Sequence, residues 1–258
     1  MLEAGLWAAL GQSALIVGAL LVARFPKLTE PRWLGLVMAL GSGALISAIT
    51  TDLVVPAYQE AGRGPTGLGL LVGALGYYGL TTWLDRRAER EDPELPVEQA
   101  ADVSLESVPA AADAAAARNL TVGMVLDGIP ESVSIGLTLL GGATVSVALV
   151  GAVFISNLPE AIGVAAALLA GGISLRKVLA RFALIVLVGA LAAALGYFLL
   201  DPSDVDVIAI IQSIAAGAMI VVVVNEMVPI AVRGAGRHAG LGAAAGFALA
   251  AFLSTLSG

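Results

Sequence analysis

Long runs of apolar residues without a charge constrain this chain more than any other feature. Two of them are Val133 to Gly151 and Phe182 to Leu200. A run of about 20 apolar residues is long enough to cross the hydrocarbon core of a membrane as a helix. Hydrophobic residues make up 59% of the chain and charged residues 13%, about half the charged share that is usual in a globular protein. The sequence therefore predicts an all-α polytopic membrane protein. A soluble enzyme, a nucleic-acid binder and a disordered chain are disfavoured.

We expect eight transmembrane helices, joined by short connections except for one charged stretch. Residues 85–118 have low hydrophobicity and three prolines, which favours a largely disordered loop. The chain then divides into residues 1–84 with helices 1–3, the loop 85–118, and residues 119–258 with helices 4–8. The spans are predicted over residues 4–23, 33–57, 66–84, 119–140, 143–170, 177–200, 205–230 and 237–257.

The basic residues predict how the chain is oriented in the membrane. Of the 13 lysines and arginines, twelve lie in or beside the connections that follow the first, third, fifth and seventh spans. Only Arg63 falls on the other side. Lysine and arginine concentrate in cytoplasmic loops. We therefore expect a multi-pass protein of the plasma membrane with residues 85–118 in the cytoplasm and both termini outside.

The basic residues lie at the edges of the predicted spans, and the ionisable residues that remain in the interiors of the spans are all acids. A carboxylate at the centre of a membrane helix costs at least ~2.5–3.5 kcal/mol on insertion scales, so such a residue indicates a function by default. No lysine or arginine in the interior of a span can neutralise these acids. They are either protonated, in which case neutral carboxyl groups tie helices together, or they hold a cation. The five acids are Asp52, Asp127, Glu131, Glu160 and Glu226.

Two neighbouring spans carry the same short signature. Residues 127–132 read Asp-Gly-Ile-Pro-Glu-Ser, and residues 156–161 read Ser-Asn-Leu-Pro-Glu-Ala. Asp127 and Glu131 are four residues apart and share one helix face. Each proline lacks an N–H and so releases one carbonyl oxygen beside a carboxylate. Carboxylates and free carbonyls near the middle of a membrane are the groups that form a cation site.

A second pair of spans shows a looser similarity. Residues 52–57 and residues 225–229 each place a polar or acidic group three or four positions before a proline. These two spans, the second and the seventh, are placed symmetrically about the fourth and fifth. This placement predicts a 3+2+3 inverted repeat, in which helices 1–3 match helices 6–8.

On these residues the chain resembles the ZIP family of divalent-metal transporters. The Pro-Glu pairs at 130–131 and 159–160 and the amide of Asn157 match the family motif His-Asn-x-Pro-Glu-Gly. Asp127 and Ser156 stand where histidine is usual. The resemblance implies eight spans, both termini outside, a long cytoplasmic loop after the third span, and transport of a divalent metal toward the cytoplasm. It also implies a binuclear-type site centred on Glu131 and Glu160.

The candidate ligands all offer oxygen, and none offers sulfur or imidazole. Oxygen ligands suit harder ions such as Mn²⁺ and high-spin Fe²⁺, whereas Zn²⁺ usually gains affinity from histidine or cysteine. We expect no cofactor other than the transported ion, which belongs to the Zn²⁺, Fe²⁺ or Mn²⁺ class. Asp52 is either a first binding position for an incoming ion or a structural anchor. The candidate metal ligands are Asp127, Glu131, Ser156, Asn157, Glu160, Asn225 and Glu226.

Two other functions remain open at this point. The missing histidines are compatible with a non-transporting metal-binding or sensor protein. Paired carboxylates are compatible with an intramembrane enzyme that uses them as acid and base, although we expect a protein that is not an enzyme. The expected partners are a divalent metal ion and the lipid bilayer, with no nucleic acid. A homodimer is an arrangement that the sequence leaves open.

Overall fold

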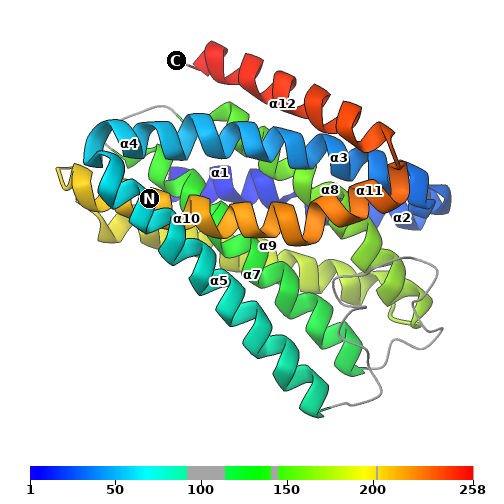
Figure 1. Ribbon diagram of the computed structural model, residues 1–258. Coiled ribbons are helices and arrows are strands. Elements are labelled where there is room, and N and C mark those ends of the chain that lie inside the picture. Colours follow the sequence, from blue (N-terminus) through cyan, green and yellow to red (C-terminus); the bar gives the residue numbers. More distant parts are fainter. Residues whose placement is uncertain (92–113, 141–144, 202, 258) are drawn as a thin grey trace.

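The computed structural model describes residues 1–91, 114–140, 145–201 and 203–257, and this part of the chain consists of helices joined by short connections, without a strand. The helices pack lengthwise into one bundle, with α12 lying across its outside (Figure 1). Their bounds are α1 Leu2–Gln12, α2 Ala14–Arg24, η1 Pro26–Thr29, α3 Pro31–Ala48, η2 Ile49–Val54, α4 Val55–Ala61, α5 Arg63–Glu91, α7 Ala114–Thr138, α8 Val147–Ala170, α9 Leu175–Leu199, α10 Val205–Val222, η4 Val223–Met227, α11 Val228–Ala235 and α12 His238–Ser257.

Seven helical segments of the described chain are long and apolar enough to cross a membrane. Each corresponds to one of the predicted spans. The predicted span 119–140 corresponds to α7, which has 25 residues and carries Asp127 and Glu131 but is not among the seven. The seven segments are Leu2–Arg24, Pro31–Ala61, Arg63–Leu84, Val147–Ala170, Leu175–Leu199, Val205–Ala235 and His238–Thr255.

The predicted cytoplasmic loop is shorter in the structure than the sequence suggested. Helix α5 continues to Glu91, and α7 begins at Ala114. Both ends of the stretch 85–118 are therefore helical, because alanines and long charged side chains favour a helix even where the chain is polar. The rest of the predicted loop, residues 92–113, lies outside the described residues.

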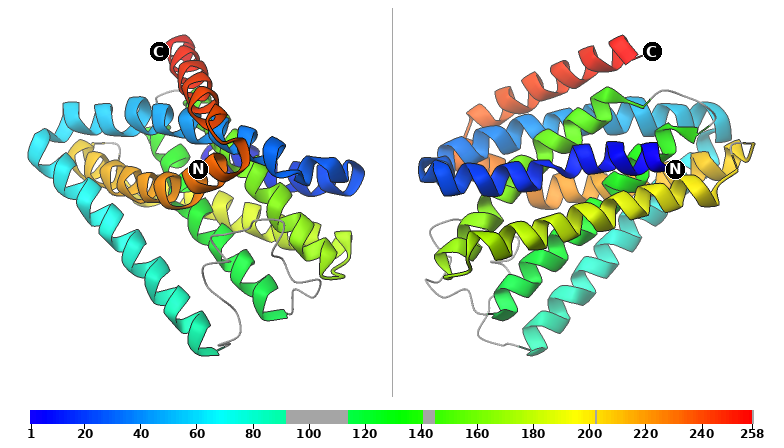
Figure 2. Two further views of the ribbon diagram at one scale, coloured as in Figure 1. Left: turned by 45° about the vertical axis from the view of Figure 1, so that its right-hand side comes forward. Right: turned by 180° about the vertical axis from the view of Figure 1, so that it is seen from behind.

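Both termini lie toward one end of the bundle. The α4–α5 and α9–α10 connections lie at that same end, and the α2–α3 and α11–α12 connections lie at the opposite end (Figures 1 and 2). Two of these connections are tight turns on a glycine, Gly62 at φ 77° and Gly236 at φ 56°. Backbone with positive φ favours glycine, which has no Cβ to clash.

Two of the membrane-capable segments, Pro31–Ala61 and Val205–Ala235, share an unusual construction. Each has 31 residues and contains a short π-helical turn, η2 or η4, in front of a proline. A proline cannot donate to the carbonyl four residues back. The residue before it compensates by bonding five residues back, from the Val55 N–H to the Thr50 carbonyl and from the Val228 N–H to the Val223 carbonyl.

This wider turn lets each helix continue through its proline. The segments therefore end at Ala61 and Ala235, several residues beyond the predicted ends at 57 and 230.

The helices form two groups that meet along α3, α7, α8 and α10. Helices α1, α2, α7, α8 and α9 pack mainly on one another, as do α3, α5, α10, α11 and α12. Within the second group, α3 lies against α12 and α5 lies against α10, both at glycines. A Cβ on Gly43 would overlap the carbonyl of Ala243, and one on Gly73 would overlap the carbonyl of Ile214. Small residues of this kind let membrane helices approach closely.

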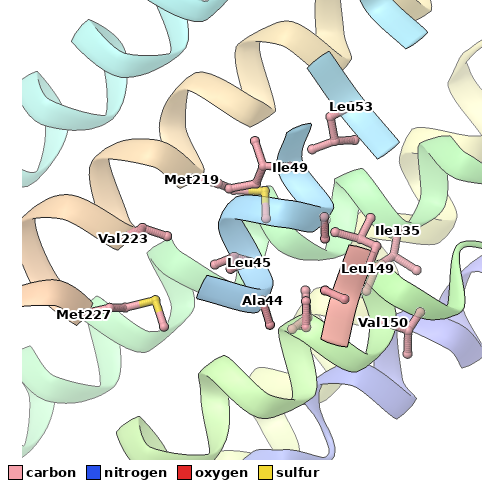
Figure 3. Packing of buried hydrophobic residues seen from close by; sticks show 14 of the residues in the cluster. Ala44, Leu45, Ile49, Leu53, Ile135, Leu149, Val150, Met219, Val223 and Met227 are labelled. Atoms are coloured by element: carbon pink, nitrogen blue, oxygen red, sulfur yellow. The ribbon is translucent and has the colours of Figure 1, made fainter. Parts of the chain in front are cut away.

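The largest cluster of buried apolar residues lies where the two groups meet. Leu45 and Ile49 of the second span pack with Ile135 of α7, Leu149 of α8 and Met219 of α10 (Figure 3). This core fixes α7, α8 and α10 relative to one another. Helices α7 and α8, together with η4, which continues α10, carry all seven predicted metal ligands.

Candidate metal centre

Helix α7 carries the first two candidate ligands, one turn apart. Asp127 and Glu131 are almost fully buried, with 5% and 4% of their surfaces exposed. The helix continues through Pro130, which lies between them. Because Pro130 has no N–H, the carbonyl of Leu126 has no partner four residues along the helix. The structure therefore brings two carboxylates to adjacent turns of α7, beside a carbonyl that lacks its usual helical donor.

Helix α8 meets α7 at Glu131 and contacts both oxygens of its carboxylate. The Asn157 amide Nδ2 donates to Glu131 Oε2 at 2.8 Å. The Ser156 hydroxyl lies 3.5 Å from Glu131 Oε1 and donates to the Val153 carbonyl at 3.0 Å. The two spans that share the Pro-Glu signature are thus in direct contact in the structure.

Asp127 contacts a different part of the molecule. The hydroxyl of Tyr77, on α5, donates to Asp127 Oδ1 and lies 3.2 Å from Glu226 Oε1. The side chains of Asp127 and Glu226 are also within hydrogen-bonding reach of each other. Three elements that are distant in the sequence, α5, α7 and η4, therefore meet through three side chains.

The predicted ligands thus fall into two adjacent sets. One joins Glu131 to Ser156 and Asn157, and the other joins Asp127 to Glu226 and Tyr77. Glu160 interacts electrostatically with acids of both sets. No three His, Asp or Glu side chains in the described ranges converge closely enough to form a ready-made metal site.

Asn225 does not join either set. Its side chain is exposed, whereas the neighbouring Glu226 is half-buried and contacts Tyr77. Adjacent residues on a helix point about 100° apart, which follows from 3.6 residues per turn. The two residues were predicted as ligands together, and the structure brings only Glu226 to the other acids.

Tyr77 was missed by sequence reasoning, although one signal could have indicated it. The residue is buried in a span whose neighbouring residues Gly76 and Tyr78 are exposed. It lies four residues after Gly73 and eight after Gly69, the two glycines of α5 that face α10. A stripe of small residues at this spacing marks a helix–helix interface, and Tyr77 extends that stripe.

A second missed residue, Gln12 of α1, supports the backbone of α7. Its side chain is 1% exposed, and its Nε2 donates to the Gly128 carbonyl at 2.7 Å and to the Ser132 hydroxyl at 2.6 Å. Gly128 and Gly189 leave room for it, because a Cβ at either position would overlap the amide. Gln12 thus fixes the turn of α7 that separates Asp127 from Glu131.

Asp52 lies apart from these residues, in η2. It accepts hydrogen bonds from Ser146 at 2.6 Å, from Thr51 at 3.1 Å and from Ser254 at 3.4 Å. Ser146 also caps α8, because its hydroxyl accepts from the Leu149 N–H at 3.0 Å. Asp52 therefore ties the start of α8 to the second span and to α12. Its role as a first binding position for an ion stays a prediction.

Helices long and apolar enough to cross a membrane, with buried carboxylates between them, define a helical membrane protein with acidic groups in its interior. Comparison with known proteins narrows this class. A family model described as ZIP zinc transporter matches residues 85–254. The match covers more than half of the 258 residues, and the chain belongs to this family. Its members are divalent-metal transporters rather than enzymes. A search of curated proteins finds no significant match.

Proposed function

We propose that this protein carries a divalent cation of the zinc, iron or manganese class toward the cytoplasm, using acids of α7, α8 and η4 as ligands. The observation that carries this proposal is the meeting of buried oxygen donors from separate spans. Asn157 contacts Glu131 at 2.8 Å, and Tyr77 links Asp127 to Glu226. A cation drawn between the two sets would offset the repulsion among their carboxylates, which is strong in a low-dielectric interior.

The ligand chemistry favours the harder ions of this class. The candidate ligands of both sets are carboxylates, an amide and a hydroxyl. Such oxygen donors suit Mn²⁺ and Fe²⁺, and Zn²⁺ loses the histidine or cysteine ligands from which it usually gains affinity. We therefore expect Mn²⁺ or Fe²⁺ to be carried at least as well as Zn²⁺.

In this proposal α7 also crosses the membrane, as the fourth span along the chain. It brings the number of spans to eight, arranged as a 3+2+3 inverted repeat. With 25 residues at about 1.5 Å each, α7 is long enough to cross the hydrocarbon core. The shared construction of Pro31–Ala61 and Val205–Ala235 supports the repeat. Each contains a π-helical turn followed by a proline, and each is followed by a glycine with positive φ.

We further propose that the protein lies in the plasma membrane with both termini outside. Two arginines near the proposed cytoplasmic boundary stack on aromatic rings, Arg24 on Phe25 at 4.9 Å and Arg87 on Trp83 at 5.6 Å. Aromatic and basic residues gather at such boundaries. A cysteine introduced by Ala100→Cys should resist an impermeant thiol reagent added to intact cells, and its labelling would reverse the orientation.

Uptake into proteoliposomes tests the proposed function. Radioactive Mn²⁺ should enter vesicles that contain the wild-type protein and be retained after washing with chelator. Glu131→Ala and Glu160→Ala should abolish uptake per folded protein, while both variants still fold and can be purified. Glu60→Ala is the matched control, because Glu60 is an exposed acid at the end of α4. Uptake by both mutants at the wild-type rate would reject the site.

The same assay distinguishes a transporter from a family member that binds metal without transporting it. A wild-type protein that binds Mn²⁺ in detergent but transports neither Mn²⁺ nor Zn²⁺ would be a non-transporting member of the family. A protein that neither binds nor transports these ions would contradict the proposal as a whole.

A further inference from the structure

Gln12, the last residue of α1, is a buried polar side chain near the middle of the membrane-capable segment Leu2–Arg24. Its amide Nε2 donates to the Gly128 carbonyl at 2.7 Å and to the Ser132 hydroxyl at 2.6 Å. These two acceptors lie four residues apart on α7. One side chain of α1 therefore bridges two successive turns of α7.

The bridged turns are the ones that carry the two acids of α7. Gly128 directly follows Asp127, and Ser132 directly follows Glu131. Pro130 lies between the acids, so α7 lacks one of its own backbone hydrogen bonds in this stretch. Helices bend most readily where a proline interrupts the backbone bonding. The amide from α1 therefore braces α7 in the stretch where the helix itself is weakest.

The two Pro-Glu signatures differ at the position three residues before the glutamate. That position is Asn157 in α8 and Gly128 in α7. The Asn157 amide donates to Glu131 Oε2 at 2.8 Å. Gly128 has no side chain, and the amide that lies against it comes from another helix. A Cβ on Gly128 would lie 2.6 Å from Gln12 Nε2, so Gln12 occupies the space that a side chain at residue 128 would need.

The other side of the Gln12 amide faces α9. A Cβ on Gly189 would lie 2.4 Å from Gln12 Oε1, so this glycine also leaves room for the amide. The Oε1 atom is buried and accepts no hydrogen bond in the part of the chain that the structure describes. A buried acceptor without a partner is unfavourable, and an apolar side chain of similar volume would avoid this penalty. The bonds of the amide to α7, rather than packing, therefore explain a glutamine at this position.

We propose that Gln12 is a positioning residue of the metal centre, which supplies from α1 the carboxamide that the α7 signature lacks at Gly128. It holds the turns of Asp127 and Glu131 in the relative position in which both acids serve the ion. This inference rests on the proposed function and extends it to a helix that carries none of the predicted ligands. Gln12 acts through α7, and its contribution is the amide group rather than the volume of the side chain.

The test moves the carboxamide from α1 to α7. Mn²⁺ binding to the purified protein in detergent is measured by titration calorimetry, per folded protein. In Gln12→Ala the dissociation constant should rise about tenfold, as expected on losing a group that supports a metal ligand. Gly128→Asn alone should also weaken binding, because the new side chain would overlap the Gln12 amide.

The double variant Gln12→Ala/Gly128→Asn should recover most of the affinity. The truncation at residue 12 opens the space that the asparagine needs, and residues 128 and 132 share one face of α7. The new amide can therefore reach the Ser132 hydroxyl. We expect a dissociation constant within about threefold of wild type, which is the non-additive result typical of residues in contact.

A second double variant separates the amide from its volume. Gln12→Ala/Gly128→Leu fills the same space without a polar group, and it should bind Mn²⁺ as weakly as Gln12→Ala. Gln212→Ala is the matched single control, because Gln212 is also buried but lies about 20 Å along its helix from Glu226. It should keep the wild-type constant. Should Gln12→Ala not be recovered folded, Gln12→Met fills the space without an amide and should show the same rise.

Several results in folded variants would overturn the inference. It is wrong if leucine at residue 128 restores binding as well as asparagine does, or if neither restores it. It is also wrong if Gln12→Ala and Gln12→Met bind Mn²⁺ like the wild type, or if Gln212→Ala weakens binding equally. Each of these results would leave the proposed function intact, because the wild-type protein would still bind and carry Mn²⁺. A wild-type protein that neither binds nor takes up Mn²⁺ would instead reject the proposed function, and the inference with it.

Discussion

Asp52 and Glu226 occupy matching places in the molecule but have different surroundings. Each lies in a π-helical turn ahead of a proline, in one of the two 31-residue segments. Asp52 accepts hydrogen bonds from three hydroxyl groups, the shortest from Ser146 at 2.6 Å. Glu226 instead meets other acids, Asp127 and Glu160, and the hydroxyl of Tyr77.

This difference shows that the same π-helical turn can place an acid in two different environments. π-Helical turns often occur at functional sites, and both turns here contain an acid. At Asp52, neutral donors satisfy the carboxylate and tie three elements together. At Glu226, nearby carboxylates leave a demand for positive charge. We therefore expect the neighbours, and not the turn, to decide whether such an acid is a structural anchor or a ligand.

Removing the charge at Glu226 should give the largest effect on transport. Glu226→Gln keeps the size of the side chain but removes its charge. Changes even to residues that only support a metal ligand cost about 10–100-fold in affinity or activity, so loss of a ligand charge should lower Mn²⁺ uptake by about 100-fold or more. The measurement is initial uptake rate in proteoliposomes, normalised to folded protein. Asp52→Asn, the matching change in the second span, serves as the control.

The comparison would fail if both variants lost uptake equally. In that case both acids would bind the ion during transport. This outcome would agree with the prediction that Asp52 is a first binding position for an incoming ion.

Changing the chemistry at Asp127 should have a smaller effect, on selectivity. Asp127→His introduces the imidazole that is usual at this position of the family motif, and imidazole favours softer ions. The preference for Zn²⁺ over Mn²⁺ should rise about tenfold, equivalent to ~1.4 kcal/mol. Competition between the two ions during uptake measures this. Asp52→His should leave the preference unchanged, and a Zn²⁺/Mn²⁺ ratio that did not move in Asp127→His would show that residue 127 does not face the ion.

Truncating Asp52 should affect stability more than transport. Asp52→Ala leaves the hydroxyls of Ser146 and Ser254 without their common acceptor, at a cost of about 1–3 kcal/mol. For a chain of this size that cost lowers the melting temperature by roughly 3–10 °C. Thermal unfolding in detergent measures the change, and uptake per folded protein should stay within about threefold of wild type, a margin of ~0.7 kcal/mol. A stable but inactive variant would assign Asp52 to the path of the ion.

The smallest effect is expected at Asp201, an exposed acid in the α9–α10 connection. It accepts from the Ser203 N–H at 2.9 Å and the Ser203 hydroxyl at 2.7 Å, and these bonds lower the pKa of Asp201. A lowered folded-state pKa adds stability above the ordinary value of about 3.9 and loses it as the pH falls through the folded pKa. Asp201→Asn should therefore unfold with a flatter pH dependence below about pH 4, with uptake unchanged. A large loss of uptake in this variant would mean that an exposed acid outside the candidate site is also needed for transport.

Several features of the fold and the site were readable from the sequence because they depend on local pattern. Apolar runs gave the membrane helices, and seven of the expected spans are confirmed as membrane-capable. The shared Pro-Glu signature marked two spans as carrying candidate ligands, and the Asn157–Glu131 bond shows that α7 and α8 are in contact at that signature. Membership of the ZIP family, expected from these motifs, is confirmed by the match over residues 85–254.

Other features depend on which way a side chain points, and the sequence does not specify that. Tyr77 and Tyr78 are chemically identical neighbours, and only packing against α10 places one of them at the acids. Gln12 is an isolated amide in an apolar helix, without a nearby motif to indicate its bonds to α7. The extended ends at Ala61 and Ala235 were missed because proline usually interrupts a helix, and the π-helical turns that prevent this leave no simple sequence pattern.

A wide turn also changes the rotational phase of the helix that contains it. One additional residue in a turn rotates everything beyond it by about 100°. In Val205–Ala235, Val224 and Asn225 face outward, while Glu226 and Met227 turn toward the interior. Met219, Val223, Met227 and Ala231 all belong to one buried core, so the segment keeps a single face toward it through the wide turn. A single-residue deletion within η4 would rotate the two parts of the segment against each other by about 100°. It would carry either Glu226 away from Asp127 or Met227 and Ala231 out of the core, so the length of this segment, as well as its composition, specifies the position of the acid.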